Sequence, residues 1–424
     1  MRKHIDSAYK ILSKVYQDGT YSNMAFLGER VSDMSTRLVY GTLEENVKID
    51  YILSQLIEKK PQKSVLTLLK IGTYALLNLS DVPKFAIVSE CVEVAKSNGK
   101  GGASGFINAV LKKVADGKYS LPKESDENYL SVTYSKPQWF CDKLEKQYGK
   151  EVARIILSAK STTLEHIRIN SRMATESDVE FLLKKNKTDF KKSDVGGYIV
   201  KANDTVRHMF DKGLVTFQSP SSILAVKALG VTDGAQNLDI CSAPGGKTFT
   251  VAEMMDGGGN ITACDIYPSR LSLIEDGAKR LGIKSIHTLL NDGSVYNKDL
   301  PLADKILCDA PCAGLGVIRR KPEIRFKTAA EVDKLPEIQY SILTISAKYL
   351  KPGGVLVYST CSLNKKENED VFYRFLGEHK DFEPIRVLPE VERAAEDGDT
   401  LTLMPHIHGS DGFFISAFRR RNTL

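Results

Sequence analysis

Two cysteines stand where covalent chemistry is possible. Cys312 ends the stretch CDAPC, and Cys361 lies within STCS. Each stretch directly follows a predicted strand, so both thiols and the carboxyl of Asp309 should meet at one edge of a sheet. Cytosine carbon 5 is a poor nucleophile, but adding a thiolate to carbon 6 makes it reactive toward an electrophilic methyl group. Two thiols and one acid could therefore methylate a pyrimidine, and this chemistry alone leaves open which thiol attacks.

The remaining cysteines give no sign of covalent or metal chemistry. All seven are spread along the chain and include no CxxC pair, so we expect neither a disulfide framework nor a bound metal. A cysteine is most often a small buried apolar residue, and this is our interpretation of Cys91, Cys141, Cys264 and Cys308. An ordinary thiol pKa of about 8.5 keeps the group protonated near neutral pH. The sequence does not identify the group that would activate an attacking thiol.

The segment DICSAPGGKT, residues 239–248, has the composition of a nucleoside-binding turn. It runs from a predicted strand into a predicted helix, and Gly245 and Gly246 let the backbone approach a ligand closely. About twenty residues after Gly245, Asp265 ends the second strand, where a carboxylate can accept hydrogen bonds from both ribose hydroxyls. Asp292 ends the third strand in the same way. These residues predict a nucleoside pocket at the carboxyl ends of the strands.

What this turn lacks indicates which nucleoside it binds. Gly246-Lys247-Thr248 resembles the end of an ATP phosphate loop, but Cys241 stands where that loop needs its first glycine, and Pro244 stiffens the segment. A dinucleotide site would need G-x-G-x-x-G, which the turn does not contain. A methyl donor that carries adenosine and an amino acid but no phosphate fits best. We therefore expect S-adenosyl-L-methionine, with some other nucleotide as the alternative.

The C-terminal half supplies the elements that position these residues. From residue 219 to residue 424, strand and helix patterns alternate, and Ser219-Pro220 is a good helix start. Regular alternation predicts a parallel doubly wound α/β sheet of the Rossmann-like kind, in which ligands bind at the carboxyl ends of the strands. The expected strands are residues 237–240, 261–265, 285–292, 305–309, 355–360 and 412–418.

Two further units precede this domain. Residues 1–120 have helical periodicity and should form an all-α bundle. The glycine-rich stretch GKGGASG joins two helical patterns and follows no strand, so a helix connection is favoured over a phosphate loop. A polar linker is expected at residues 117–137. Residues 140–218 combine short strands with a helical pattern and many lysines, which predicts a small ferredoxin-like α/β segment.

The composition excludes several classes of protein. With 42% hydrophobic and 26% charged residues, the 424-residue chain has the make-up of a globular protein and not of a disordered or fibrous one. Its length suggests two or three domains. The N-terminal segment alternates charged and apolar residues, so we expect no signal peptide and no membrane span, and we place the protein in the cytoplasm. The net charge of +6 permits a polyanionic partner.

Three motifs and the N-terminal third carry a resemblance to a known family. The stretches DAPCAGLGVIRRKPEIRF and YSTCS look like the two cysteine motifs of RNA 5-methylcytosine methyltransferases, and the CSAPGGK turn accompanies them. The first third resembles the NusB antitermination factor, notably in GFINAVLKKV. The combination is similar to the RsmB family, also called Sun or Fmu, over nearly the whole chain. The resemblance implies a NusB-like RNA-binding domain, a class I methyltransferase domain, and methylation of carbon 5 of one cytosine in 16S ribosomal RNA.

The resemblance also implies a role for each site residue. Cys361 would add to the base, while Cys312 would help release the product by removing the carbon 5 proton. Asp309 would hold ring nitrogen 3 and stabilise the adduct. Asp265 would bind the ribose of the methyl donor and Asp292 its adenine. The residues expected to bind the donor are Cys241, Ser242, Ala243, Pro244, Gly245, Gly246, Lys247, Asp265, Arg270, Asp292 and Asp309.

Two groups of residues are expected to contact RNA. The first follows the Cys312 loop, where basic side chains would lie close to the target base and could hold its phosphates. The second lies at the end of a strand in the middle segment and matches a family pattern near the active site. Turning a cytosine out of a paired helix would cost about a few kcal/mol, which favours a loop or unfolded RNA as substrate. The first group is Arg319, Arg320, Lys321 and Arg325, and the second is Arg168 and Asn170.

Three other functions are compatible with the sequence. The target could be a cytosine of another RNA, such as transfer RNA or 23S ribosomal RNA. The chain could instead be a NusB-like RNA-binding or antitermination module, although this leaves two thirds of the chain unexplained. A DNA methyltransferase would use the cysteine of its Pro-Cys motif, here Cys312, as nucleophile. The sequence does not specify which nucleotide is methylated, or whether the substrate is naked RNA or a partly assembled subunit. For the oligomeric state, a monomer is our expectation.

Overall fold

The computed structural model divides into two compact units by its internal contacts. The helical unit comprises Met1–Ser158 and Lys321–Lys327, and the sheet unit comprises Ala159–Arg320 and Thr328–Leu424. Residues 140–158 were expected in the middle segment, but they form helices that belong to the helical unit. The residues that the structure describes are 1–20, 22–26, 31–159, 164–255, 258–391 and 399–422.

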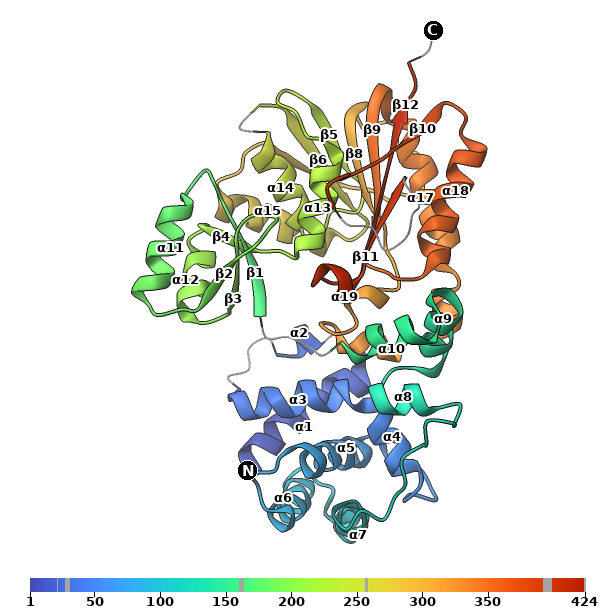
Figure 1. Ribbon diagram of the computed structural model, residues 1–424. Helices are drawn as coiled ribbons and strands as arrows, with labels where there is room; N and C mark the ends of the chain where they lie inside the picture. The colour runs from blue at the N-terminus through green and yellow to red at the C-terminus, as the bar shows by residue number, and fades with distance from the viewer. Residues whose placement is uncertain (21, 27–30, 160–163, 256–257, 392–398, 423–424) are drawn as a thin grey trace. The chain divides into compact units, whose positions relative to one another are not determined.

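The described residues of the helical unit form helices and no strand, in agreement with the predicted all-α bundle (Figure 1). Helix α5 is buried along most of its length and lies at the centre of the apolar core. The stretch GKGGASG forms the one-turn helix Gly101–Ala103 and the start of α7, so it is a helix connection as predicted. The helices are α1 (Arg2–Asp18), α2 (Ser22–Ala25), α3 (Asp33–Glu44), α4 (Asn46–Ser54), α5 (Lys63–Asn78), α6 (Lys84–Ser97), α7 (Ser104–Ala115), α8 (Tyr129–Tyr134), α9 (Gln138–Tyr148) and α10 (Lys150–Ser158).

A short segment from the C-terminal half completes the helical unit. Lys321–Lys327 contains a 3-10 turn and packs among residues far away in the sequence. The ring of Phe326 meets the ring of Tyr16 edge-on, with centroids 5.7 Å apart. The indole Nε1 of Trp139 donates a hydrogen bond to the carbonyl of Lys327 at 3.1 Å. The chain therefore leaves the sheet unit for this segment and then returns to it.

The small sheet has the ferredoxin-like arrangement that the sequence predicts. Its strands lie in the order β2-β3-β1-β4, and each neighbouring pair is antiparallel. Helices α11 and α12 share one apolar core with the sheet. The three-residue strand β2 and helix α12 were not predicted, because neither is long enough to show a clear period. The elements are β1 (Leu164–Ile169), α11 (Glu176–Lys185), β2 (Phe190–Lys192), β3 (Tyr198–Lys201), α12 (Asp204–Asp211) and β4 (Val215–Phe217).

The large sheet is mixed, which corrects the expectation of a wholly parallel sheet. Its order is β10-β12-β9-β8-β5-β6-β7, and β11 pairs with β12. Strands β5 to β9 pair in parallel, but β12 is antiparallel to β9, β10 and β11. A parallel neighbour needs a crossover of a dozen or more residues, and only residues 404–412 separate β11 from β12. The strands are β5 (Gln236–Asp239), β6 (Asn260–Asp265), β7 (Ile286–Leu290), β8 (Ala303–Asp309), β9 (Leu350–Thr360), β10 (Phe382–Ile385), β11 (Thr400–Leu403) and β12 (Phe413–Arg420).

Helices cover both faces of the large sheet (Figure 1). One apolar core holds α13, α14 and α15, and the other holds α17 and α18. The polar segments that contain the predicted site residues follow β5, β6, β7, β8 and β9, so the sheet gathers them at one edge. The helices are α13 (Pro220–Leu229), α14 (Gly246–Met254), α15 (Pro268–Leu281), α16 (Ala329–Val332), α17 (Leu335–Lys348), α18 (Glu369–Glu378) and α19 (Pro405–His408), with 3-10 turns at Leu315–Val317 and Lys365–Glu367.

Candidate active site

The two cysteines singled out in the sequence meet in the sheet unit. Cys312 follows β8 and Cys361 follows β9, and because these strands are neighbours the Sγ atoms lie 3.0 Å apart. Both side chains are partly buried. The hydrogen bond to Cys361, together with burial, raises the pKa of Cys312 well above its ordinary value. Both effects favour the protonated form of Cys312.

A carboxylate and an ammonium group lie at the same edge. Oδ2 of Asp309 accepts a hydrogen bond from Nζ of Lys247 at 2.6 Å, and Oδ1 accepts one from Oγ of Ser359 at 2.7 Å. Ser359 is the register partner of Asp309 on β9, while Lys247 belongs to the first turn of α14. Burial lowers the pKa of Lys247, but the neighbouring acidic groups, chiefly Asp309, together outweigh burial and the net shift is upward. Lys247 is therefore a fixed cation, and its charge also acts on Cys361.

The turn after β5 is shaped to leave space before helix α14. Ser242 donates two hydrogen bonds to the carbonyl of Cys264, from its backbone N–H at 2.8 Å and its Oγ at 2.7 Å. Gly245 has a φ of 104°, and a Cβ there would lie 2.5 Å from the ring of Phe249. A Cβ at Gly246, in contrast, would meet no atom within 4 Å. An open helix start of this kind can accept the carboxylate or another polar group of a ligand.

Two acids follow the strands beside this turn. Asp265 ends β6 and is buried, with Oδ1 accepting from the backbone N–H of Tyr267 at 3.0 Å. Nη1 of Arg270 lies 3.9 Å from the other oxygen. Asp292 follows β7 and is exposed, and its Oδ1 accepts from the backbone N–H and the Oγ of Ser294 at 2.9 and 2.6 Å. A carboxylate at the end of the second strand suits the two hydroxyls of a ribose, so the residues present fit an adenosine-containing methyl donor.

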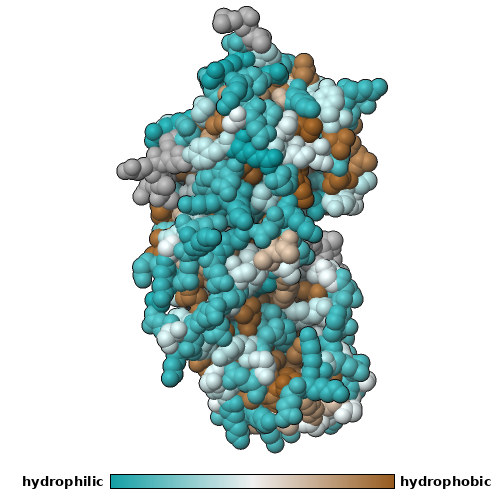
Figure 2. All heavy atoms as spheres, turned by 90° about the vertical axis from the view of Figure 1, so that its right-hand side faces the viewer, coloured by the Kyte–Doolittle hydropathy of each residue, from teal (hydrophilic) through white to brown (hydrophobic). Residues whose placement is uncertain are grey.

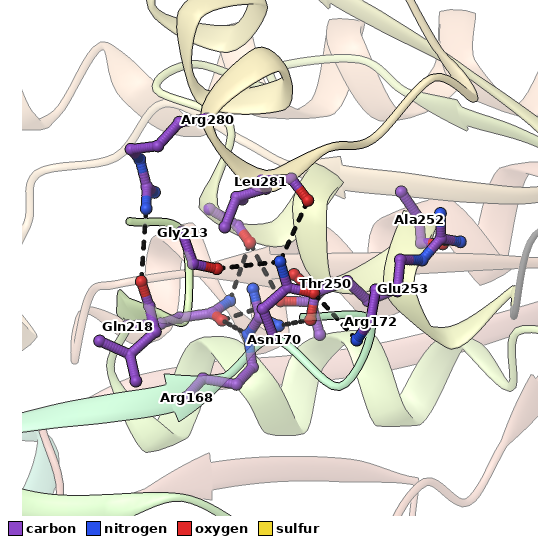
Figure 3. Close-up of polar contacts among 12 residues, drawn as sticks. Arg168, Asn170, Arg172, Gly213, Gln218, Thr250, Ala252, Glu253, Arg280 and Leu281 are labelled. Carbon is purple, nitrogen blue, oxygen red and sulfur yellow. Dashed lines mark hydrogen bonds and ion pairs between the residues drawn. The ribbon is translucent and has the colours of Figure 1, made fainter. Parts of the chain in front are cut away.

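Arg168, which was expected to contact RNA, is buried inside the sheet unit (Figure 3). Its guanidinium forms an ion pair with Glu253 of α14, and its Nε donates to Oε1 of Gln218 at 2.7 Å. The same oxygen of Gln218 accepts a hydrogen bond from Oγ1 of Thr250 at 2.8 Å. Nε2 of Gln218 donates to the carbonyl of Gly246 at 3.1 Å. Arg168 therefore connects the small sheet to α14, the helix that begins at Gly246.

Asn170 is also buried and serves the same connection (Figure 3). Its Nδ2 donates to the carbonyl of Gly213 at 3.0 Å and to that of Leu281, at the end of α15, at 3.1 Å. Nη2 of Arg172 adds a hydrogen bond to the carbonyl of Ala252 at 2.9 Å. We therefore assign Arg168 and Asn170 to internal connections of the sheet unit, because their polar groups point toward protein and not toward a surface.

The basic residues after Cys312 have unequal surroundings. Nε of Arg319 and Nε of Arg320 each lie 2.8 Å from the carboxylate of Asp411, whose side chain is nearly fully buried. Lys321 is exposed. Arg325 is buried in the helical unit, where its Nε donates to the carbonyl of Ser135 at 3.0 Å, so it does not present its charge to a surface as predicted. Of this group, Arg319, Arg320 and Lys321 stay candidates for phosphate contacts.

Comparisons with known proteins give the family. A model described as 16S rRNA methyltransferase RsmB/F matches residues 226–419, and the NusB family model matches residues 6–116. The probable ribosomal RNA small subunit methyltransferase B of Bacillus subtilis is 35% identical over 98% of both chains. The chain belongs to the RsmB/F methyltransferase family. This confirms the resemblance predicted from the motifs, including the NusB-like first third.

Further relatives and solved structures agree with this family and fold. The probable ribosomal RNA small subunit methyltransferase B of Synechocystis is 31% identical over 91% of this RsmB/F chain and 90% of its own. The crystal structure of PH0851 covers 99% of both chains with a TM-score of 0.88 at 24% identity. The structure of NSun6 from Pyrococcus horikoshii with SFG covers 68% of this chain and 99% of its own, with a TM-score of 0.62 at 22% identity. At these identities the two structures support the fold.

Two further observations on this RsmB/F chain concern metal ions and membranes. Within the described ranges, no group of three or more histidine, cysteine or acidic side chains could hold a metal ion. None of the helices in those ranges is long and apolar enough to cross a membrane.

The sequence did not reveal every residue that shapes the site. The hydroxyl of Ser359 that fixes Asp309 gives no distinguishing signal in the segment YSTCS. Glu367 lies in the charged run KKENED, where nothing in the sequence distinguishes it from its neighbours. The side chain of Glu367 is nevertheless fully buried.

Proposed function

We propose that this chain transfers a methyl group from S-adenosylmethionine to carbon 5 of a cytosine in 16S ribosomal RNA, through a covalent adduct with Cys361. One observation carries the proposal: two thiols lie 3.0 Å apart beside the Asp309–Lys247 ion pair. Membership of the RsmB/F family and the names of the relatives support ribosomal RNA as the substrate class. Together they favour a nucleophilic mechanism over simple methyl transfer to an already reactive atom.

The chain's own residues can divide the steps of this reaction. The Cys361 sulfur bonds to carbon 6 as the double bond between carbons 5 and 6 opens, and the Lys247 charge favours the thiolate. The proton that Cys361 releases would pass to ring nitrogen 3, and Asp309, held by Lys247 and Ser359, would accept a hydrogen bond from that nitrogen and so stabilise the adduct. S-adenosylmethionine, when bound, supplies the electrophilic methyl group that becomes attached to carbon 5. The residues predicted to hold it are those of the turn after β5, with Arg270, Asp265 and Asp292.

The thiol pair suggests how the product leaves. The largest cause of the raised pKa of Cys312 is its hydrogen bond to Cys361, and that cause is removed once the Cys361 sulfur is bonded to the base. The pKa of Cys312 then falls toward the value that burial alone sets, and in this proposal Cys312 passes its proton to water before its sulfur takes the proton from carbon 5. The carbon 5 electron pair restores the ring double bond, and the bond from carbon 6 to Cys361 breaks. The two thiols thus have different roles because one controls the acidity of the other.

Trapping the adduct tests this division of roles. Cys312→Ala should accumulate a covalent complex with RNA that survives a denaturing gel, because the carbon 5 proton cannot be removed. Cys361→Ala should give neither complex nor methylated product. Cys308→Ala is a matched control, since burial raises the pKa of this β8 thiol to about 12 and keeps it protonated. The opposite pattern, with the complex in Cys361→Ala, would exchange the two roles.

The choice of substrate needs a separate assay. Labelled S-adenosylmethionine is incubated with 16S ribosomal RNA, 23S ribosomal RNA, transfer RNA and DNA. We expect label in the 16S ribosomal RNA, and in 5-methylcytosine after digestion. Label only in transfer RNA or 23S ribosomal RNA would keep the chemistry and replace the target. Label only in DNA would contradict the proposal.

A further inference from the structure

Glu367 connects the two loops that hold the thiols. Its side chain is fully buried at the end of the 3-10 turn Lys365–Glu367. Oε2 accepts a hydrogen bond from the backbone N–H of Ala313 at 2.7 Å, and Oε1 accepts one from Oγ of Ser362 at 2.7 Å. Ala313 directly follows Cys312, and Ser362 directly follows Cys361. A single carboxylate therefore ties the residue after one thiol to the residue after the other.

Two side-chain amides complete the surroundings of this carboxylate. Nε2 of Gln339 donates to Oε2 at 3.0 Å and also to the carbonyl of Pro311, on the other side of Cys312, at 2.9 Å. Nδ2 of Asn364 donates to Oε1 at 3.0 Å. Each oxygen of Glu367 thus accepts two hydrogen bonds. Bonds to a buried charged acceptor are roughly twice as strong as neutral ones, which makes this a stiff connection.

The next residue fixes the other flank of Cys361. Oδ1 of Asn368 accepts from Oγ1 of Thr360 at 2.6 Å, and its Nδ2 donates to the carbonyl of Ser362 at 3.0 Å. Asn368 is fully buried as well. The residues on both sides of Cys361 are therefore held from one short segment, and that segment also reaches the Cys312 loop through Glu367.

We propose that Glu367 is a positioning residue that sets the separation and orientation of the Cys312 and Cys361 thiols. It acts through Ala313 and Ser362 and touches neither sulfur nor substrate. The inference rests on the proposed function for its catalytic consequence, although the geometric part concerns the thiols alone. An attacking atom misplaced by about 1 Å can cost about a hundredfold in rate, so a rigid link between the two loops has a direct kinetic effect.

Replacing the carboxylate by an amide tests the link without changing its size. In Glu367→Gln one oxygen becomes an NH₂ group, which faces two donors at one side and cannot accept from either. In the Cys312→Ala background, with saturating donor and RNA, we expect the rate of covalent complex formation to fall about a hundredfold. Binding of RNA and of donor should stay within about twofold, because Glu367 contacts neither. Glu369→Gln is the matched control, since Glu369 accepts from Thr402 and not from a thiol loop.

A conservative variant separates positioning from folding. Glu367→Asp keeps the charge but is one methylene shorter, so it should recover part of the lost rate. Should Glu367→Gln fail to fold, Gln339→Met removes the bonds to Glu367 and Pro311 and leaves the carboxylate with three donors. This variant should slow complex formation about tenfold. A rate equal to that of the parent in the folded variants would overturn the inference.

A chemical measure of thiol proximity requires no RNA. A diazenedicarboxamide oxidant takes one hydrogen from each of two thiols, is reduced to the hydrazine, and leaves a disulfide. The rate at which the Cys312–Cys361 disulfide forms is followed by mass spectrometry of the linked peptides, in protein that is otherwise unchanged. This rate should be at least tenfold lower in Glu367→Gln than in the parent. An unchanged oxidation rate would refute the positioning role. Absence of any RNA complex in Cys312→Ala with Glu367 intact would instead count against the proposed function, and the oxidation rates alone would then decide the inference.

Discussion

Removing the buried guanidinium of Arg168 should destabilise the sheet unit strongly. The side chains of Arg168 and Glu253 are only 10% and 6% exposed, so Arg168→Met leaves a carboxylate in a nearly dry interior. Breaking a buried ion pair by removing one partner costs about 3–5 kcal/mol. The loss of the Nε bond adds little, because Oε1 of Gln218 keeps its bond from Thr250. We therefore expect the free energy of unfolding to fall by about 3–5 kcal/mol near pH 7.

A double variant and the pH dependence make this expectation specific. Replacing a whole buried pair by apolar side chains is often neutral, so Arg168→Met with Glu253→Met should regain most of the loss. Burial already raises the pKa of Glu253, and Arg168 opposes that rise. Without Arg168 the folded pKa rises further above the unfolded value of about 4.3. The stability linked to a raised pKa is present at low pH and lost as pH rises, so the Arg168→Met defect should shrink toward pH 5.

Urea unfolding followed by far-ultraviolet circular dichroism is the suitable assay. The single tryptophan, Trp139, belongs to the helical unit, so its fluorescence would not report on the sheet unit. Arg374→Met is the control, because its partners are exposed and the loss should be much smaller. If Arg168→Met kept the parent midpoint while losing affinity for ribosomal RNA, Arg168 would be a direct RNA contact and the internal role assigned here would be wrong.

Two further predictions concern the same unit. Burial raises the pKa of Asp239 to about 7, although a hydrogen bond from Thr248 opposes this rise. The free energy of unfolding should therefore decline between pH 4 and pH 7. Asp239→Asn should remove up to about 4 kcal/mol of that decline, as measured by urea titration across this pH range. A Cβ on Gly316 would lie 1.9 Å from the carbonyl oxygen of Gly412, so Gly316→Ala should lower stability by about 1–3 kcal/mol or more in thermal unfolding. A Cβ on Gly105 would meet no atom within 4 Å, so Gly105→Ala should not lower stability. Equal losses of stability in both variants would contradict the packing argument.

Local patterns predicted the parts of the fold that repeat a period or carry a motif. The strands that end at Asp265 and Asp309 and the turn at residues 239–248 lie where the sequence placed them. The meeting of Cys312 and Cys361 followed from one rule, that parallel strands end at a common edge. The antiparallel direction of β12 was missed because an apolar strand has the same composition in either direction.

Long-range polar pairing could not be predicted from the sequence. An arginine in a strand gives no sign of a partner, and Glu253 lies on a helix far along the chain from Arg168. Glu367 is similarly placed among charged neighbours, so its burial between two loops depends on contacts that no local pattern records. Arg325 was predicted to face RNA because it follows a cysteine motif, yet its segment packs within the helical unit.

Because Lys321–Lys327 belongs to the helical unit, the chain cannot be separated into its two units by a single cut. Cutting after Ser158 would remove Tyr16 and Trp139, the ring and the indole against which Phe326 and Lys327 rest. A hybrid that exchanges residues 1–158 between relatives must therefore exchange residues 321–327 with them. Substitutions in these two stretches should accordingly appear together among descendants, although more than 150 positions separate them along the chain.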